Sequence, residues 1–377
     1  MQEEYFGEGM INRLPAFLKR IGCKKIFLVT GKKSFEKSGA RDKIFNAGFD
    51  FEYVRFSDFT ENPKTEDVEK GIKQLKNSQC DTIVAIGGGS VIDMAKLINI
   101  FSANSMDVNS FISNSIRIER KGKPLTAIPT TSGAGSEATH FAVLYNDKEK
   151  YSAAHEFILP DLVIIDPELT YDLTPQQTAV SGIDALAQAI ESHWSVNSTD
   201  ESKKYSSSAI KLVIDNLADA VKNPKPESRR EMSRAANLAG KAINITKTTA
   251  PHALSYTMTS YFGVTHGQAV SITLGEFMKY NFEVSETDVT DKRGAEYVKR
   301  SILEIAEIMG CSSAYDAADK IKILMKDTGL KTSLKGLGIS SSESLKLIAE
   351  NVNTERLQNN PRKLTKSGLE VIIRNII

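Results

Sequence analysis

The stretch Thr82-Ile83-Val84-Ala85-Ile86-Gly87-Gly88-Gly89-Ser90 decides the fold class of this chain. Its apolar and β-branched residues predict a buried strand, and the glycines predict a tight turn into a helix capped by Ser90. Asp93 stands three residues after Ser90, in the position of a capping box. Glycine lets a backbone approach a ligand closely, and a helix start offers free N–H groups. The stretch therefore predicts a phosphate cradle, or else a tight turn without a ligand.

The sequence around this stretch alternates strand-like and helix-like segments. The other predicted strands are residues 25–30, 51–56, 125–129 and 162–166. The predicted helices between the first strands are residues 34–47 and 66–75. Alternation of this kind predicts a parallel sheet with helices on both faces.

From residue 174 onward, strand signals nearly vanish and helical patterns run to the end. The predicted helices are residues 176–194, 202–221, 229–243, 298–309, 314–325 and 343–351. The change in character predicts an α/β dinucleotide-binding domain over residues 1–172. It also predicts an all-helical metal and substrate domain over residues 173–377.

The composition is that of an ordinary globular protein. Of the 377 residues, 41% are hydrophobic and 25% are charged, and the net charge is +1. Neither a nucleic-acid partner nor a membrane-surface role driven by bulk charge is expected. The first residues, Gln2-Glu3-Glu4-Tyr5, lack the basic start of a signal peptide, and no apolar run approaches a membrane span. The three widely spaced cysteines fit a reducing cytoplasm.

Two further loops are candidates for cofactor binding. Gly31-Lys32-Lys33-Ser34 follows the first strand and carries two lysines where an acidic residue would bind the ribose of NAD. NADP(H) is therefore favoured over NAD(H), unless the lysines belong to a solvated turn. Thr130-Thr131-Ser132 begins a hydroxyl-rich loop that would bond phosphate or ribose, or its own backbone. The predicted cofactor-binding residues are Gly31, Lys32, Lys33, Ser34, Gly87, Gly88, Gly89, Ser90, Asp93, Thr130, Thr131 and Ser132.

A second group of residues looks like a metal site. Asp184 and Gln188 are four apart, so they share one face of a helix. His252 and His266 are 14 apart, a rise of about 21 Å in a straight helix, which is too far for one ion. The chain must therefore turn back between them, and residues 261–265 are a plausible place.

Glutamine is a poor ligand for a first-row metal beside imidazole. Asp184, His252 and His266 would hold Fe²⁺ or Zn²⁺ with Gln188 weak or swung away, or the metal is lost, or the residues are structural. His193 lies nine residues after Asp184 on the opposite helix face, so it does not easily complete the set.

Taken together, these residues resemble the iron-containing alcohol dehydrogenase family over nearly the whole chain. Residues 87–96 resemble its G-G-G-S-x-x-D-x-A-K signature, and residues 128–133 resemble its second cofactor loop. Asp184, His252 and His266 match three of its four metal ligands. The resemblance implies the dehydroquinate synthase-like fold, an α/β nucleotide domain followed by an all-α metal domain, and a homodimer or larger oligomer. Gln188 departs from the usual ligand histidine, and Tyr256 from a further histidine thought to relay protons.

Residues 184–195 and 359–362 look most like the branch that reduces phosphonoacetaldehyde to 2-hydroxyethylphosphonate. Thr246-Lys247-Thr248-Thr249 stands just before His252, and its lysine and hydroxyls would bind a phosphonate, or would be a helix end with a surface lysine. Arg356 and Arg362 would help if the C-terminal segment folds over the cleft.

The expected function is hydride transfer from NAD(P)H to a small aldehyde, a phosphonate among the candidates, with Tyr256 or a water that it holds as the proton source. A general short-chain alcohol dehydrogenase is the first alternative, and the related lyase and sugar-phosphate dehydrogenase branch shares the fold. A nucleotide-binding relative without catalysis is the alternative from another class.

Overall fold

The computed structural model of the chain describes residues 2–104, 108–112 and 117–377. These residues form two compact units, one up to Leu173 and one from Thr174 to Ile377, and each is described by itself. No helix among the described residues combines the length and apolar character that a membrane span requires.

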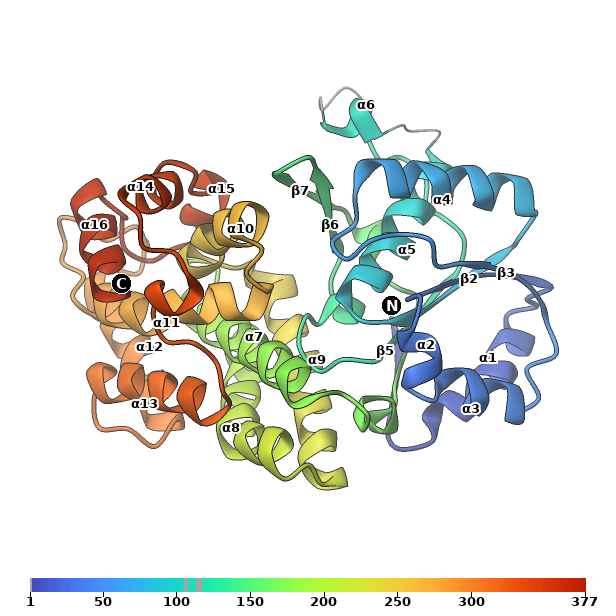
Figure 1. The fold of residues 1–377 in the computed structure, drawn as a ribbon, viewed down its shortest axis with the longest axis horizontal. Coiled ribbons are helices and arrows are strands. Elements are labelled where there is room, and N and C mark those ends of the chain that lie inside the picture. Colours follow the sequence, from blue (N-terminus) through green and yellow to red (C-terminus); the bar gives the residue numbers. More distant parts are fainter. Residues whose placement is uncertain (1, 105–107, 113–116) are drawn as a thin grey trace. The chain divides into compact units, whose positions relative to one another are not determined.

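A parallel sheet is the centre of the first unit (Figure 1). Its six described strands are, in spatial order, β1 (Glu3–Phe6), β8 (Leu162–Ile165), β5 (Leu125–Pro129), β4 (Thr82–Gly87), β2 (Lys25–Thr30) and β3 (Glu52–Phe56). All neighbouring strands are parallel, as predicted. Only β1 was not predicted, because its charged residues lack a strand pattern. It pairs with β8 alone and forms one edge of the sheet, where charges are tolerated.

Helices cover both faces of this sheet, which confirms the second part of the prediction. They are α1 (Leu14–Arg20), α2 (Ser34–Lys37), α3 (Ala40–Asn46), α4 (Thr65–Ser78), α5 (Gly89–Ala103) and α6 (Val108–Ile112), with short 3₁₀ turns at Met10–Arg13, Ser136–Ala138, Glu156–Ile158 and Pro167–Thr170. Alternate residues of β2 point to opposite faces. Phe27 joins the core under α4 and α5, and Ile26 joins the core over α1 and α3.

Two local predictions for this unit were wrong, and one hairpin was not predicted. The helix expected over residues 34–47 is two helices, because Gly39 adopts a left-handed φ of 71° between them. Ser90 does not cap α5; the cap is Gly88, and the Ser90 hydroxyl accepts a hydrogen bond from the Asn62 amide. The antiparallel hairpin of β6 (Phe141–Asn146) and β7 (Glu149–Ala154) was missed.

Asp93 and Lys96 of α5 are buried, and no side chain caps the start of this helix, so Asp93 does not form the expected capping box. Asp93 Oδ2 accepts from the Val143 amide at 3.0 Å. Lys96 Nζ donates to the carbonyl oxygens of Ser136, Thr139 and Phe141 at 2.5–3.0 Å. Burial lowers the pKa of Lys96 to about 8, although the charges of Asp93 and Glu137 oppose that shift. Lys96 therefore ties α5 to the segment that follows the second predicted cofactor loop.

The second unit consists of helices, as predicted, with one isolated bridge between Val289 and Arg362. The helices are α7 (Pro175–Trp194), α8 (Asp200–Lys222), α9 (Pro226–Thr246), α10 (Ala250–Phe262), α11 (His266–Phe282), α12 (Ala295–Ile308), α13 (Ala314–Asp327), α14 (Ser342–Glu350), α15 (Thr354–Leu357) and α16 (Lys366–Asn375), with a 3₁₀ turn at Lys335–Leu337.

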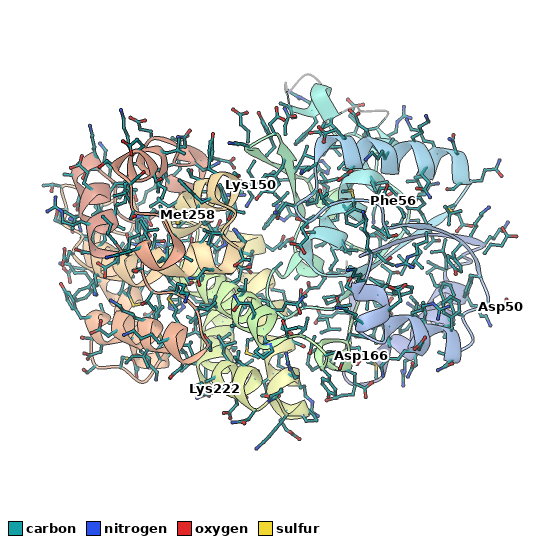
Figure 2. The ribbon with its side chains drawn as sticks, in the orientation of Figure 1. Asp50, Phe56, Lys150, Asp166, Lys222 and Met258 are labelled. Carbon is teal, nitrogen blue, oxygen red and sulfur yellow. The ribbon has the colours of Figure 1, made fainter. Side chains whose placement is uncertain are left out.

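Helix α7 contains a long run of buried residues and begins with a capping box. Thr174 accepts from the Gln177 amide, Gln177 accepts from the Thr174 amide, and Pro175 fills the first helical position. From Gly182 to Trp194 every residue of α7 is buried. Figure 2 shows Met258 inside this unit and Phe56 inside the first unit, where both are at most 3% exposed, while Lys222 and Asp50 lie on the outside of their own units.

We predict that Lys96→Met lowers the free energy of unfolding by about 3 kcal/mol, because three buried carbonyl oxygens lose their donor at about 1 kcal/mol or more each. Urea denaturation followed by circular dichroism measures this change. Lys76→Met is the matched control, since Lys76 is exposed on α4. A loss for Lys96→Met no larger than that of the control would show that the ammonium group does not stabilise the segment.

Candidate active site

The structure brings two of the predicted cofactor loops together at the carboxyl edge of the sheet. β4 ends at Gly87 and its neighbour β5 ends at Pro129, and the Thr130 amide donates to the Gly87 carbonyl at 3.0 Å. A Cβ on Gly89 would lie 2.7 Å from Ala134 Cβ, which is closer than such atoms approach. The loops therefore pack against each other at the start of α5, where the unpaired N–H groups and the helix dipole favour an anion.

The third predicted loop, Gly31 to Ser34, follows β2 at the same edge of the sheet. Asp58, which follows β3 and was not predicted to belong here, pairs with Lys32 at 2.9 Å. That hydrogen bond lowers the pKa of Asp58. Both side chains are more than half exposed, so the pair is weak, but it places an acidic group beside the lysines. Of the two lysines of this loop, Lys33 has no ion pair among the described residues.

In the second unit, Asp184, His252 and His266 converge, and their ligand atoms lie within 4.8 Å of one another. Asp184 Oδ1 is 3.6 Å from His252 Nε2 and 3.8 Å from His266 Nε2. Ligands about 2.1 Å from a tetrahedral ion are separated by about 3.4 Å, so the three atoms need only small movements to share one ion. The chain reverses between the two histidines at Gly263, inside the range predicted for that turn.

A close approach of two helices makes this convergence possible. Gly267 follows His266 at the start of α11, and a Cβ there would lie 2.0 Å from the Val180 carbonyl oxygen and 3.1 Å from Asp184 Cβ. A side chain at position 267 would therefore push α11 away from α7 and carry His266 away from Asp184. The sequence argument did not single out Gly267.

Glu191 is a second residue that the sequence argument missed. It is fully buried on α7, and its Oε1 accepts a hydrogen bond from His252 Nδ1. This bond leaves His252 Nε2 facing Asp184, and a carboxylate behind a histidine is typical of metal ligands. Burial works against a charge on His252, but Glu191 and Asp184 outweigh it and raise the pKa of His252 to about 10. Glu191 stands seven residues after Asp184, a spacing that puts both on one helix face.

Glu191 is itself held by the start of α10. Its Oε2 accepts from the Thr249 amide at 2.6 Å and from the Thr249 hydroxyl at 2.8 Å, and Trp194 Nε1 donates to that hydroxyl at 2.9 Å. The Thr246 hydroxyl is directed to Ser192 and the Ala242 carbonyl. The Thr246 and Thr249 hydroxyls thus hold α7, α9 and α10 together, which does not support these two as anion ligands. An anion contact by the rest of this run stays a prediction.

Gln188 lies beside Asp184, as the helical spacing predicts. Its amide nitrogen donates to Asp184 Oδ2 at 3.1 Å, and the residue is 4% exposed. This contact is made by the amide nitrogen and orients the Asp184 carboxylate, whereas a metal would be bound by the amide oxygen. The amide as a metal ligand stays a prediction. His193 bonds Ser206 and Glu304 instead and lies outside the set, as expected.

Of the two predicted catalytic residues, Tyr256 contacts a metal residue, whereas Lys247 only precedes His252 in the chain. Tyr256 is one turn after His252 on α10 and stacks on His266, with ring centroids 6.3 Å apart. Lys247 is in the link between α9 and α10, where its backbone adopts φ 59° and ψ 174°. Its Nζ is 3.8 Å from Glu355 and its side chain is 42% exposed. Neither role is tested by these positions, and both stay predictions.

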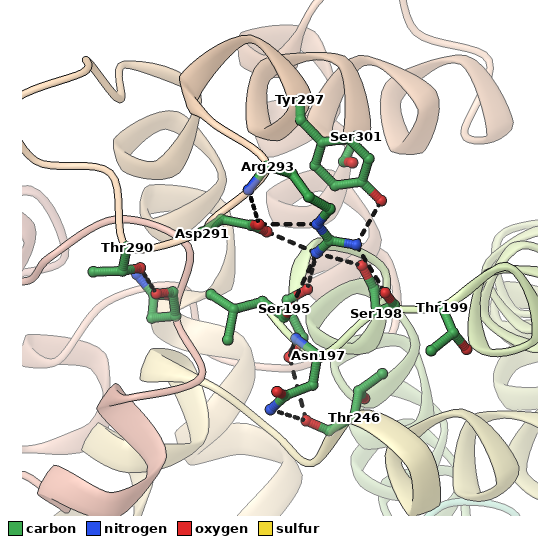
Figure 3. Close-up of polar contacts among 12 residues, drawn as sticks. Ser195, Asn197, Ser198, Thr199, Thr246, Thr290, Asp291, Arg293, Tyr297 and Ser301 are labelled. Carbon is green, nitrogen blue, oxygen red and sulfur yellow. Dashed lines mark hydrogen bonds and ion pairs between the residues drawn. The ribbon is translucent and has the colours of Figure 1, made fainter.

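A polar network around Arg293 fixes the loop that follows α7 (Figure 3). The guanidinium donates to the carbonyl oxygens of Ser195 and Ser198 at 3.0 and 2.8 Å, and pairs with Asp291 at 2.7 Å. Within the same loop, Asn197 donates to the Thr246 carbonyl at 3.3 Å. The ends of α7 and α9 are thereby joined, which keeps Glu191 in reach of α10.

We predict that Gly89→Ala weakens NAD(P)H binding about tenfold, because the added methyl group overpacks the contact with Ala134 and shifts the start of α5. Quenching of intrinsic fluorescence by the dinucleotide measures the affinity. Adding Ala134→Gly to the same chain removes the atom that the new methyl group meets and should restore most of the binding. Wild-type affinity in the single variant would contradict this assignment.

We predict that Glu191→Gln lowers the affinity for Fe²⁺ or Zn²⁺ about 10–100-fold, because His252 loses the charge that orients its ring. Competition with a chromogenic chelator measures the metal affinity. Glu370→Gln, an exposed change on α16, is the control and should leave it unchanged. Equal affinities for the two variants would remove Glu191 from the site.

Comparison with known proteins agrees with this geometry. The model of the family described as iron-containing alcohol dehydrogenase matches residues 2–167. The model described as the C-terminal part of the Fe-containing alcohol dehydrogenase family matches residues 178–377. Each unit of the structure therefore carries one of the two halves of this family.

Individual relatives span nearly the whole chain. A long-chain-alcohol dehydrogenase of Geobacillus thermodenitrificans is 29% identical over 98% of this chain and 93% of its own. A phosphonoacetaldehyde reductase of Streptomyces viridochromogenes is 33% identical over 82% of this chain and 80% of its own. The crystal structure of a sulfoacetaldehyde reductase from Bifidobacterium kashiwanohense in complex with NAD⁺ superposes with a TM-score of 0.89, at 30% identity, over 100% of this chain and 96% of that one. The chain belongs to the iron-containing alcohol dehydrogenase family and is a nicotinamide-dependent alcohol dehydrogenase.

Proposed function

We propose that this enzyme reduces a small aldehyde that carries an anionic group to the primary alcohol, with phosphonoacetaldehyde as the substrate and 2-hydroxyethylphosphonate as the product. The observation that carries the proposal is the convergence of Asp184, His252 and His266, with Glu191 behind His252. Three ligands that leave a position open are the arrangement of a catalytic metal site, not of a closed structural one.

The residues have separate roles in this proposal. A divalent ion, Fe²⁺ or Zn²⁺, would polarise the aldehyde carbonyl, and NAD(P)H would supply the hydride to the carbonyl carbon. Glu191 holds the His252 ring in its binding orientation, and Gln188 holds the Asp184 carboxylate. Tyr256, or a water that it holds, gives the proton to the product oxygen.

Two relatives support an anionic substrate. The reductases from Streptomyces viridochromogenes and Bifidobacterium kashiwanohense are named for phosphonoacetaldehyde and sulfoacetaldehyde, which are acetaldehydes with a tetrahedral oxyanion group. Lys247, with an exposed ammonium group just before the helix that carries His252, offers a positive charge to such a group. Sulfoacetaldehyde is accordingly the second candidate substrate, and an uncharged short-chain aldehyde is the alternative.

The preference for NADP(H) is also a proposal, and Lys33 now supports it more than Lys32 does, because Lys32 is paired with Asp58. Asp58 works against this preference, because a carboxylate at this position accepts hydrogen bonds from the ribose of NAD and repels the phosphate of NADP. We further propose a homodimer or larger oligomer in the cytoplasm, to which the three free cysteines of the described chain are suited.

We predict that protein purified without chelator contains close to one equivalent of iron or zinc and reduces phosphonoacetaldehyde with a kcat/KM at least about tenfold above that for propanal, because a charge-assisted contact is worth about 1.5–3 kcal/mol. Elemental analysis and the loss of NADPH absorbance measure these quantities, with sulfoacetaldehyde and NADH run in parallel. Equal kcat/KM values for the charged and uncharged aldehydes would reject the anionic substrate. Full turnover in metal-free protein would reject the metal.

A further inference from the structure

Arg356 is a buried cation in the second unit that the roles above do not use. It lies on α15, which packs against α10, and is 8% exposed. Asn353 caps α15 by accepting from the Arg356 amide at 3.0 Å, and the Asn353 amide donates to the Ala253 carbonyl at 3.4 Å. The segment is thus fastened to α10 one residue after His252, and its arginine points inward.

The guanidinium of Arg356 has no carboxylate partner among the described ion pairs of this unit. Arg293 and Arg362 provide the contrast, because each pairs with an aspartate at 2.7 Å. Arg362 also donates to the Tyr280 carbonyl and stacks on that ring, so the sequence-based suggestion that it helps to bind an anion is not supported.

The groups that act on Arg356 are Tyr256, Glu355 and Glu191. Burial disfavours the charge, but these groups offset it and raise the pKa of Arg356, so the side chain is cationic. Glu191 is already bonded to His252 and Thr249, and Glu355 lies near Lys247. Removing an arginine from water without a bonded anion is unfavourable. An anion that binds there would recover part of that free energy.

Tyr256 links this arginine to the metal residues. Its ring stacks on His266, and its phenol is the hydrogen-bonding neighbour of Arg356. An anion bound at Arg356 and a carbonyl bound at the metal residues would therefore lie on either side of the Tyr256 side chain. Phosphonoacetaldehyde and sulfoacetaldehyde carry both groups, an aldehyde and an oxyanion group separated by a single methylene carbon.

We propose that Arg356 binds the oxyanion head group of the substrate and sets the preference of the enzyme for charged aldehydes. The proposal rests on the proposed function and deepens it. Arginine presents a planar fork of N–H donors that matches two oxygens of a phosphonate or sulfonate at once, which a single ammonium group such as that of Lys247 does not. Lys247 adds charge from the solvent side, and Arg356 fixes the orientation.

The test compares Arg356→Met with Arg356→Lys and with Arg374→Met, which removes an exposed charge on α16. The quantity measured is the ratio of kcat/KM for phosphonoacetaldehyde to that for propanal. We expect Arg356→Met to lower this ratio about 100-fold and Arg356→Lys about tenfold, with no change in Arg374→Met. An unchanged ratio in Arg356→Met, with both substrates slowed alike, would overturn the proposal and assign Arg356 to the support of Tyr256.

Calorimetric titration with methylphosphonate and with methanesulfonate gives a readout that does not depend on turnover. We expect the wild type to bind at least one of these anions and Arg356→Met to bind it about 100-fold more weakly, and the better of the two identifies the head group. Thermal melts show whether each variant is folded, and Arg356→Lys keeps the test open if the methionine variant is not.

The two proposals fail in different ways. Reduction of propanal by a wild-type enzyme that binds neither anion would overturn the role of Arg356 and leave the aldehyde reductase intact. Binding of methylphosphonate through Arg356 in a protein that reduces no aldehyde would support the anion site and reject the proposed function.

Discussion

The helical unit depends on the donors and cations that neighbouring helices supply to two buried carboxylates. Asp184 and Glu191 lie on the same face of α7 and are 5% and 0% exposed. An ionised carboxylate that is buried alone costs several kcal/mol, so both require donors or cations from neighbouring helices. α10 provides His252 and Thr249, and α11 provides His266. The same contacts that stabilise the buried charges therefore also bring the metal-ligating atoms together.

Local spacing was sufficient to identify part of this site. Asp184 and Gln188 were paired by their helical period, and the long interval between His252 and His266 required the reversal that Gly263 makes. Glu191 and Gly267 were not identified, because their roles depend on which helix lies opposite them. A buried glutamate on an apolar helix face is visible in the sequence, but the sequence does not tell that its partner is His252 Nδ1.

In the first unit, too, local patterns identified some features, whereas features that depend on distant partners were missed. Continuous apolar strands and their alternation with helices were sufficient for the parallel sheet, since buried parallel strands have few alternatives. The edge strand β1 was missed because its pairing with β8 comes from the other end of the unit, more than 150 residues away in sequence. The glycine run was rightly assigned to the turn before α5, whereas the burial of Lys96 could not be anticipated, because its oxygen partners come from an irregular segment.

Lys247 has a consequence beyond its charge. Its φ of 59° and ψ of 174° fall in a region that only glycine occupies without strain, and a side chain held there costs on the order of 1–3 kcal/mol. This backbone strain lies in the short link between α9 and α10. A glycine at 247 would relieve it and would also delete an ammonium group from the neighbourhood of His252. At position 247, a substitution that raises the stability of the fold therefore also removes a positive charge.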